Sequence, residues 1–207
     1  IFKVVEKLMV NLFKSFSNKK IMSEKFPRIS FDEAIQKYGT DKPDLRNPLI
    51  INDVTKIFSN NSTNFEIFKK LVKDGGVVKS IVTKNTKNKP RSFFDNIDKW
   101  AKEQGASGLA YFTIEKNQSL FGKGPVGKFF SEEAIKEIMK ISKSSVGDTI
   151  FLACGEQNEI IKFLSIARNK IALDLKLIDD QQFAFCWIVD YPMFERNSVT
   201  KKIEFSH

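Results

Sequence analysis

Residues 26–46 read FPRISFDEAIQKYGTDKPDLR and carry the clearest local structural signals in the chain. Ser30 is a residue type that caps helix N-termini, and Glu33 follows three positions later, which is the capping-box arrangement. Gly39 can adopt the left-handed conformation that closes a helix. The sequence therefore predicts a short helix over residues 31–38. Pro43 disfavours helix at the residue before it, so we expect an extended, rigid segment to follow.

Four further helices are predicted on either side of this stretch. Their apolar residues recur three and four positions apart, the spacing of a helix with one buried face. The predicted segments are residues 1–16, 93–105, 132–142 and 160–175. Ser131 is the expected N-cap of the third, and Glu132 and Glu133 in its first turn are favourable against the helix dipole.

Strands are predicted where β-branched and aromatic residues cluster. Residues 65–71 and 77–83 flank the sequence Asp74-Gly75-Gly76, and glycine supplies the positive φ of a tight turn, so we expect a β-hairpin there. Residues 109–114 and 149–154 are two further predicted strands. Residues 183–189 form a continuous apolar run, which predicts a strand buried on both faces.

The predicted elements indicate a small α+β domain. Between about residues 60 and 158 their order is strand, strand, helix, strand, helix, strand. This order is typical of a two-layer domain in which helices pack on an antiparallel sheet. The segments on both sides of it are not expected to fold alone as compact units.

Composition bounds the class of protein. The chain has 207 residues, of which 42% are hydrophobic, and no run approaches the about 20 apolar residues of a membrane helix. The first 16 residues are interrupted by charges, so they do not form a secretory signal. We therefore expect a cytoplasmic protein without a membrane partner. A chain that starts at Ile1 and ends at His207 is interpreted as cut at both ends.

The two cysteines predict no metal site. Cys154 and Cys186 lie in apolar surroundings without CxxC or Cys/His spacing, and His207 is the single histidine. We expect buried free thiols. The loop GKGPVG at residues 122–127 lacks the GxxxxGK[ST] spacing of a phosphate-binding loop, so we expect a mobile or structural loop.

The net charge is +9, from 34 Lys and Arg against 25 Asp and Glu. Such an excess permits a nucleic-acid partner, because Lys and Arg neutralise phosphates. The lysines are scattered, however, and no aromatic–basic RNA-binding signature accompanies them. Composition alone therefore permits an RNA partner without establishing one.

Two blocks of the sequence resemble bacterial-type aspartyl-tRNA synthetases, which are class II enzymes. These blocks are residues 26–46, with Thr40 where the family commonly has Ser, and residues 185–195, which read FCWIVDYPMFE. Between them, GGVVKSI (75–81), GASGLAYFTI (105–114), GPVGKFF (124–130) and GDTIFLA (147–153) resemble a domain inserted between the second and third class II motifs. The same domain type occurs in one of the subunits of the tRNA-dependent amidotransferase. Cys154-Gly155-Glu156 departs from the Gly-Ala-Asp-like run that is common there.

The resemblance implies three parts and a reaction. Residues 1–48 and 161–207 would be segments of an antiparallel catalytic domain, and residues 49–160 the inserted α+β domain. The parent enzyme would activate aspartate with ATP and Mg²⁺ to aspartyl-adenylate, transfer it to tRNA, and act as a homodimer. The ATP-binding motifs would lie outside this chain. We therefore expect no catalytic or metal-binding residue in it and no activity from the chain alone.

The resemblance also implies roles for individual residues. His207 follows the second block by a short hairpin, where the family has a histidine that contacts bound aspartate. Asp41, Lys42, Asp44 and Arg46 would lie at the exit from the catalytic domain into the insertion. They are expected either to close the rim of the active site or to lock the hinge by salt bridges.

Two other classes of function are weighed beside this one. A non-catalytic tRNA-binding module related to the amidotransferase would share the inserted domain but not the two flanking blocks. A basic RNA-binding protein would explain the charge but not the ordered blocks. The sequence does not decide between charging of tRNA for aspartate only and charging of tRNA for asparagine as well.

Overall fold

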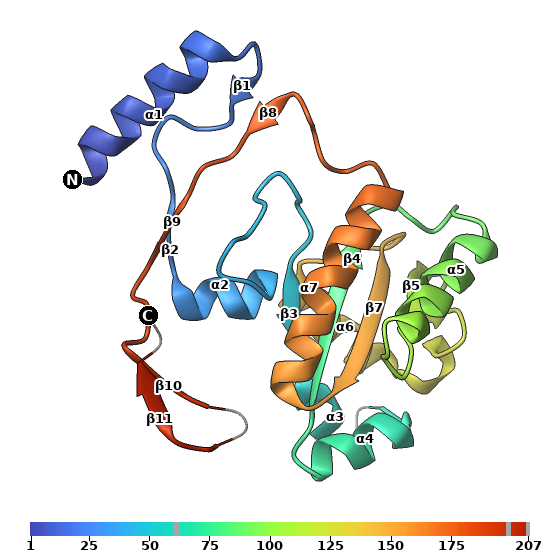
Figure 1. The fold of residues 1–207 in the computed structure, drawn as a ribbon. Helices are drawn as coiled ribbons and strands as arrows, with labels where there is room; N and C mark the ends of the chain where they lie inside the picture. The colour runs from blue at the N-terminus through green and yellow to red at the C-terminus, as the bar shows by residue number, and fades with distance from the viewer. Residues whose placement is uncertain (60–62, 198–199, 206–207) are drawn as a thin grey trace.

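The computed structural model describes residues 1–59, 63–197 and 200–205 in two lobes (Figure 1). The sheet lobe, residues 49–175, is built on five strands in the spatial order β3-β4-β7-β5-β6. All neighbouring strands in this sheet are antiparallel. Their bounds are β3 Ile51–Asp53, β4 Val77–Thr83, β5 Ala110–Lys116, β6 Leu120–Lys123 and β7 Thr149–Gly155.

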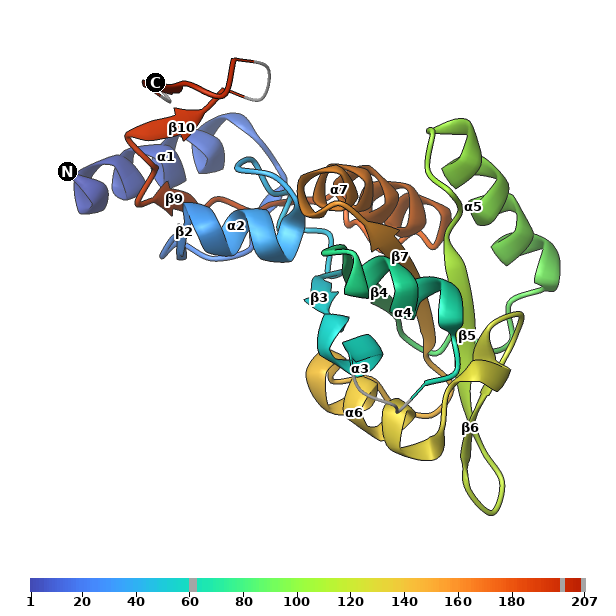
Figure 2. The same cartoon turned by 90° about the horizontal axis from the view of Figure 1, so that it is seen from below.

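Helices cover both faces of this sheet (Figure 2). On one face, α5 (Arg91–Glu103) and α7 (Gln157–Asp174) pack over strand residues such as Ile81 and Phe151. On the other face, α3 (Thr55–Ser59), α4 (Glu66–Lys73), η1 (Gly127–Phe129) and α6 (Glu132–Ser142) surround residues such as Phe112 and Leu152. The α+β class with an antiparallel sheet is confirmed. The prediction of two layers is wrong, because successive residues of β7 enter two separate cores and require a helical layer on each side.

The predicted hairpin at residues 65–83 is wrong in its first half. Residues 66–73 form helix α4, and β4 pairs with β3 and β7 instead. Phe65, Phe68 and Val72 are three and four positions apart and contact the core together, which only a helix achieves. The turn after α4 is real, since Gly75 has a φ of +92°.

Strand β6 was not predicted, because its last residues belong to the GKGPVG sequence. Gly122 and Gly127 bring two backbone segments together: a Cβ on Gly127 would lie 2.1 Å from the carbonyl oxygen of Gly122. A side chain at either position would force these segments apart. This contact gives the glycines of the loop a structural role, as expected.

The outer lobe combines residues 1–48 and the described part of 176–205, from both ends of the chain (Figure 1). Two short parallel pairs join the ends, β1 with β8 and β2 with β9, and β10 and β11 form an antiparallel hairpin. The elements are α1 Phe2–Phe16, β1 Lys20–Ile21, β2 Arg28–Ser30, α2 Phe31–Tyr38, β8 Gln182–Phe183, β9 Trp187–Val189, β10 Phe194–Arg196 and β11 Ile203–Phe205.

The outer lobe confirms one local prediction and corrects another. Helix α2 spans the predicted residues, the Ser30 hydroxyl accepts a hydrogen bond from the Glu33 backbone N–H at 3.2 Å, and Gly39 ends the helix with a φ of +74°. The strand predicted over residues 183–189 is instead the two short strands β8 and β9. Its residues are only partly buried, so burial on both faces is wrong for this segment. In the described residues, no helix is both long and apolar enough to cross a membrane.

Candidate functional site: the junction between the lobes

The chain passes from α2 into the sheet lobe through residues 39–50, which hold all the residues predicted for the rim or hinge. At the start of this linker, Lys42 Nζ lies 2.9 Å from Asp41 Oδ2. This hydrogen bond lowers the pKa of the Asp41 carboxyl. The Tyr191 hydroxyl lies 3.5 Å from the same oxygen, so the linker contacts the segment that follows β9.

Asp44 and Arg46 form a second, separate pair further along the linker. Arg46 donates from Nε at 2.9 Å and from Nη2 at 2.7 Å to the two carboxylate oxygens of Asp44. This bidentate contact lowers the pKa of the Asp44 carboxyl. Arg46 Nη1 also lies 3.6 Å from the Asp180 carboxylate, which follows α7. The four predicted residues therefore make two ion pairs rather than one cluster.

Arg168 on α7 holds the end of the linker and was not singled out from the sequence. Its side chain is buried, with 1% of the residue exposed. Nε donates to the Leu49 carbonyl at 2.6 Å, and Nη2 donates to the carbonyls of Asp44 and Asn47 at 2.9 and 2.8 Å. Burial lowers the pKa of this guanidinium. An arginine is suited to this task because its planar group carries five donors in a fixed geometry.

The Asn47 side chain, in the linker, also hydrogen-bonds to α7. Its Nδ2 donates to the Arg168 carbonyl and to the Asn169 side-chain oxygen, both at 3.2 Å, while its Oδ1 accepts from the Leu49 backbone N–H. We call Asn47 and Arg168, with the carbonyls they bind, the linker clasp. The two residues are 121 positions apart, so no local sequence pattern could pair them.

Helix α2 touches the sheet lobe at two further points. A Cβ on Gly39 would lie 2.7 Å from the Ile161 carbonyl oxygen and from Ser165 Cβ on α7, so this turn requires glycine for space as well as for its positive φ. Lys79, buried in strand β4, places Nζ 2.8 Å from Asp53 Oδ2 and 3.3 Å from Gln36 Oε1 on α2. The junction is thus polar and hydrogen-bonded on both sides.

The other predicted groups fall outside the junction. His207 lies outside the described residues. Cys154 and Cys186 are free and partly buried, and burial raises the pKa of the Cys154 thiol to about 11 and also raises that of Cys186. In the described part of the chain, no group of three or more His, Cys, Asp or Glu side chains is arranged to hold a metal ion.

Comparisons with known proteins find similarity in the sheet lobe and along the whole chain. Residues 68–164 match the GAD domain family. The whole chain is 69% identical over 207 residues to an aspartate–tRNA(Asp/Asn) ligase of Pelagibacter ubique, covering 35% of that protein. It is 44% identical over 208 aligned residues to the ligase of the same name from Methylorubrum populi, covering 34% of it. The chain therefore spans about a third of the length of the curated relatives it matches.

These matches agree with the division into two lobes. The family match lies within the sheet lobe, and the similarity to the relatives covers both lobes, from one end of the chain to the other. The resemblance seen in the sequence is confirmed: residues 68–164 match the GAD domain family, and the chain is similar over its whole length to a segment of aspartate–tRNA(Asp/Asn) ligases.

Proposed function

We propose that this chain is part of an aspartate–tRNA ligase, in which the outer lobe belongs to the catalytic domain and the sheet lobe is an insertion. The observation that carries the proposal is the parallel pairing of β2 with β9. It places residues 28–30 of the first block beside residues 187–189 of the second, although the whole sheet lobe separates the two blocks in sequence (Figure 1). This topology is expected when one domain is inserted into another. The amidotransferase-related module lacks such flanks.

The borders of the insertion follow from α7. The sequence predicts parts at residues 1–48, 49–160 and 161–207, but α7 runs continuously across position 160. Its buried residues, including Leu164 and Ile171, pack on the sheet. We therefore propose that the insertion extends to about residue 175 and that the catalytic segments are 1–48 and 176–207.

The activity follows from the relatives. The complete protein would join aspartate to AMP, with release of pyrophosphate from ATP, and then transfer the aspartyl group to the terminal ribose of tRNA. The name of the relatives supports charging of tRNA for both aspartate and asparagine. We further propose a homodimer in the cytoplasm. The described residues offer no carboxylate cluster that fits Mg²⁺, so we assign it no ligand here and derive no step through it.

The contacts at the junction favour one of the two roles expected for the linker residues. We propose that Asp41, Lys42, Asp44 and Arg46 lock the hinge, because each carboxylate is already occupied by a neighbouring cation. His207 is proposed to donate a hydrogen bond to the carboxylate of bound aspartate.

Aspartate-dependent exchange of pyrophosphate into ATP tests the proposed function. The full-length protein that contains this chain should show exchange with aspartate, and the 207-residue chain alone should show none above background. Exchange supported by another amino acid in place of aspartate would overturn the proposal. In the full-length protein, His207→Ala should raise the KM for aspartate; an unchanged KM would remove that residue's role.

A further inference from the structure

The sheet lobe carries its positive charge unevenly along the strands. Thr83 of β4 pairs with Thr149 of β7, so the loop after β4 and the loop before β7 lie at the same end of the sheet. These loops, residues 84–90 and 143–148, contain four lysines, Lys84, Lys87, Lys89 and Lys143, and one acidic residue, Asp148. At the other end, acidic residues such as Asp74, Glu103, Glu156 and Glu159 alternate with lysines. One end of the sheet is therefore distinctly basic.

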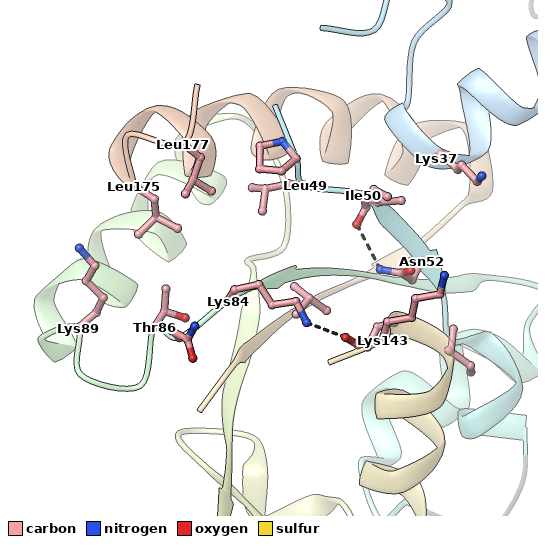
Figure 3. A pocket seen from close by; sticks show the side chains of 15 residues that line it. Lys37, Leu49, Ile50, Asn52, Lys84, Thr86, Lys89, Lys143, Leu175 and Leu177 are labelled. Atoms are coloured by element: carbon pink, nitrogen blue, oxygen red, sulfur yellow. Dashed lines mark hydrogen bonds between the residues drawn. The ribbon is translucent and has the colours of Figure 1, made fainter. Parts of the chain in front are cut away.

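A cleft of about 660 Å³ opens beside this basic end (Figure 3). Lys37 from α2, Lys84 and Lys89 from the loop after β4, and Lys143 from the end of α6 line it. Apolar side chains form much of the remaining lining, among them Leu49, Ile141, Leu175 and Leu177, together with the amides of Asn52 and Asn85 and the hydroxyls of Thr86 and Ser142. The cleft thus has cations from both lobes around an apolar wall.

Two of these lysines are already used in the fold. Lys84 Nζ donates to the Lys143 carbonyl at 2.6 Å (Figure 3). It also donates to Asp148 Oδ2 at 2.9 Å, and the two bonds tie the basic loops together. Asp148 is 2% exposed and also accepts from two backbone N–H groups, so it cannot neutralise a further cation. Lys37 is paired with Glu33 at 2.6 Å.

The other two lysines keep their charge available. Lys89 and Lys143 are exposed and form no ion pair with a carboxylate in the described part of the chain, although Lys89 Nζ lies 5.7 Å from the centroid of the Phe93 ring. Lys143 occupies the left-handed C-cap of α6, with a φ of +51°, and Lys84 holds the carbonyl of that turn. Hydrogen bonds therefore hold the backbone of both residues at the cleft, through the Lys143 carbonyl and through the Lys89 N–H, which donates to the Thr86 carbonyl at 3.0 Å.

We propose that this cleft binds the sugar–phosphate backbone of RNA, with Lys89 and Lys143 contacting phosphates and Leu175 and Leu177 lying against the ribose side. The choice of RNA, and of tRNA in particular, rests on the proposed function, because the charge alone fits any phosphodiester chain. Lysines that contact phosphates fix the position of a nucleic acid without reading its sequence. Binding at this cleft would contact both lobes at once.

The test compares two double variants that each remove two positive charges. K89Q/K143Q removes two lysines that line the cleft. K70Q/K73Q is the control and removes two exposed lysines of α4 that do not line it. Binding of fluorescently labelled tRNA to the 207-residue chain is followed by anisotropy over a range of salt concentrations. Circular dichroism confirms that each variant is folded.

We expect K89Q/K143Q to weaken binding about tenfold near 0.1 M salt and to reduce the slope of log K against log salt by about 2, since each phosphate contact contributes about 0.9. K70Q/K73Q should change affinity less than threefold. Equal losses of tRNA affinity in the two variants would overturn the proposal that RNA binds at this cleft. Inorganic phosphate that displaces tRNA at constant ionic strength would overturn it as well, because the site would then be one for a small anion.

The result is separable from the test of the proposed function. Aspartate-dependent pyrophosphate exchange does not require tRNA contact at this cleft, so K89Q/K143Q in the full-length protein should retain it. Retained exchange with unchanged tRNA binding would overturn the cleft alone. Loss of cleft-dependent tRNA binding is therefore never confused with loss of aspartate activation.

Discussion

The two lobes differ in how completely they bury their apolar side chains. In the sheet lobe, both faces of the sheet are covered, and residues such as Phe112, Phe151 and Ile138 are fully buried. In the described part of the outer lobe, the buried apolar residues are Val10, Phe26, Ile29 and Ala34. Its strands form only two-stranded sheets, which are marginally stable in water. The comparison indicates that the sheet lobe supplies its own stability and the outer lobe does not.

One face of α1 is apolar but exposed to solvent. Val4, Leu8, Leu12 and Phe16 recur every four residues and are 72%, 61%, 45% and 84% exposed. The opposite face is packed, since Phe13 makes edge contacts with Phe183 and Phe185. Under the proposed function, the remaining part of the catalytic domain would cover the open face. In the 207-residue chain, the outer lobe therefore depends on its junction with the sheet lobe to keep its structure.

The largest contrast should come from removing one phenylalanine in each lobe. Phe112→Ala opens a cavity in the core between the sheet and α6 and should lower the free energy of unfolding by about 3–5 kcal/mol. Phe16→Ala removes a side chain that is 84% exposed and should change it by less than about 0.5 kcal/mol. Urea unfolding measures both. Similar losses in the two variants would break the comparison between the lobes.

The linker clasp should give the next largest effect. Arg168→Met leaves the carbonyls of Asp44, Asn47 and Leu49 without their donor, and we expect a loss of about 3 kcal/mol. The matched control is Arg91→Met on α5, whose side chain is 85% exposed, with an expected loss below about 1 kcal/mol. Equal losses would mean that the clasp adds nothing beyond a surface arginine.

A smaller effect should depend on pH. Arg46 lowers the pKa of Asp44 below its ordinary value of 3.8, so the folded state favours the ionised carboxylate. This contribution is present above the unfolded pKa and is lost as pH falls through the folded pKa. Asp44→Asn should therefore be less stable than the unaltered chain at about pH 6, and the difference should shrink towards about pH 3. Urea unfolding at several pH values measures it; a constant difference would contradict the ion pair.

The smallest effect should come from a buried hydroxyl without a partner. Ser80 Oγ is buried in the sheet and makes no hydrogen bond to any residue that the structure describes. Ser80→Ala should be neutral or stabilising by up to about 1 kcal/mol, because an unsatisfied polar group is removed. Thr149→Val is the control: its hydroxyl contacts those of Thr86 and Thr113, and its loss should destabilise by about 1–2 kcal/mol. A marked loss of stability in Ser80→Ala would point to a partner such as a buried water.

Local signals predicted the elements that are set by local chemistry. Helix α2 was delimited by Ser30 and Gly39, and α6 by Ser131, since each cap satisfies the backbone groups of its own helix. Helix α4 was misread because eight residues fit both a short strand and two turns of helix. Only its packing beside Phe58 and Phe130 decides between them.

The junction was predictable only in part. The ion pair of Asp44 with Arg46 is two positions apart in sequence and could be expected from the block that contains it. Arg168 lies on an amphipathic helix, where an arginine usually faces solvent. Its burial depends on Asn47 and the linker carbonyls, and Asn47 lies 121 positions away in sequence. The three-layer arrangement likewise depends on α7 returning to the sheet.

Hydrogen exchange of the backbone amides in the 207-residue chain tests the independence of the sheet lobe most directly. Peptides from β4, β5 and β7 should exchange only through global unfolding. Peptides from α1, β8 and β9 should exchange much faster, and Arg168→Met should accelerate them further while β5 is protected until the chain unfolds. Equal protection of α1 and β7, lost together in a single event, would contradict the account.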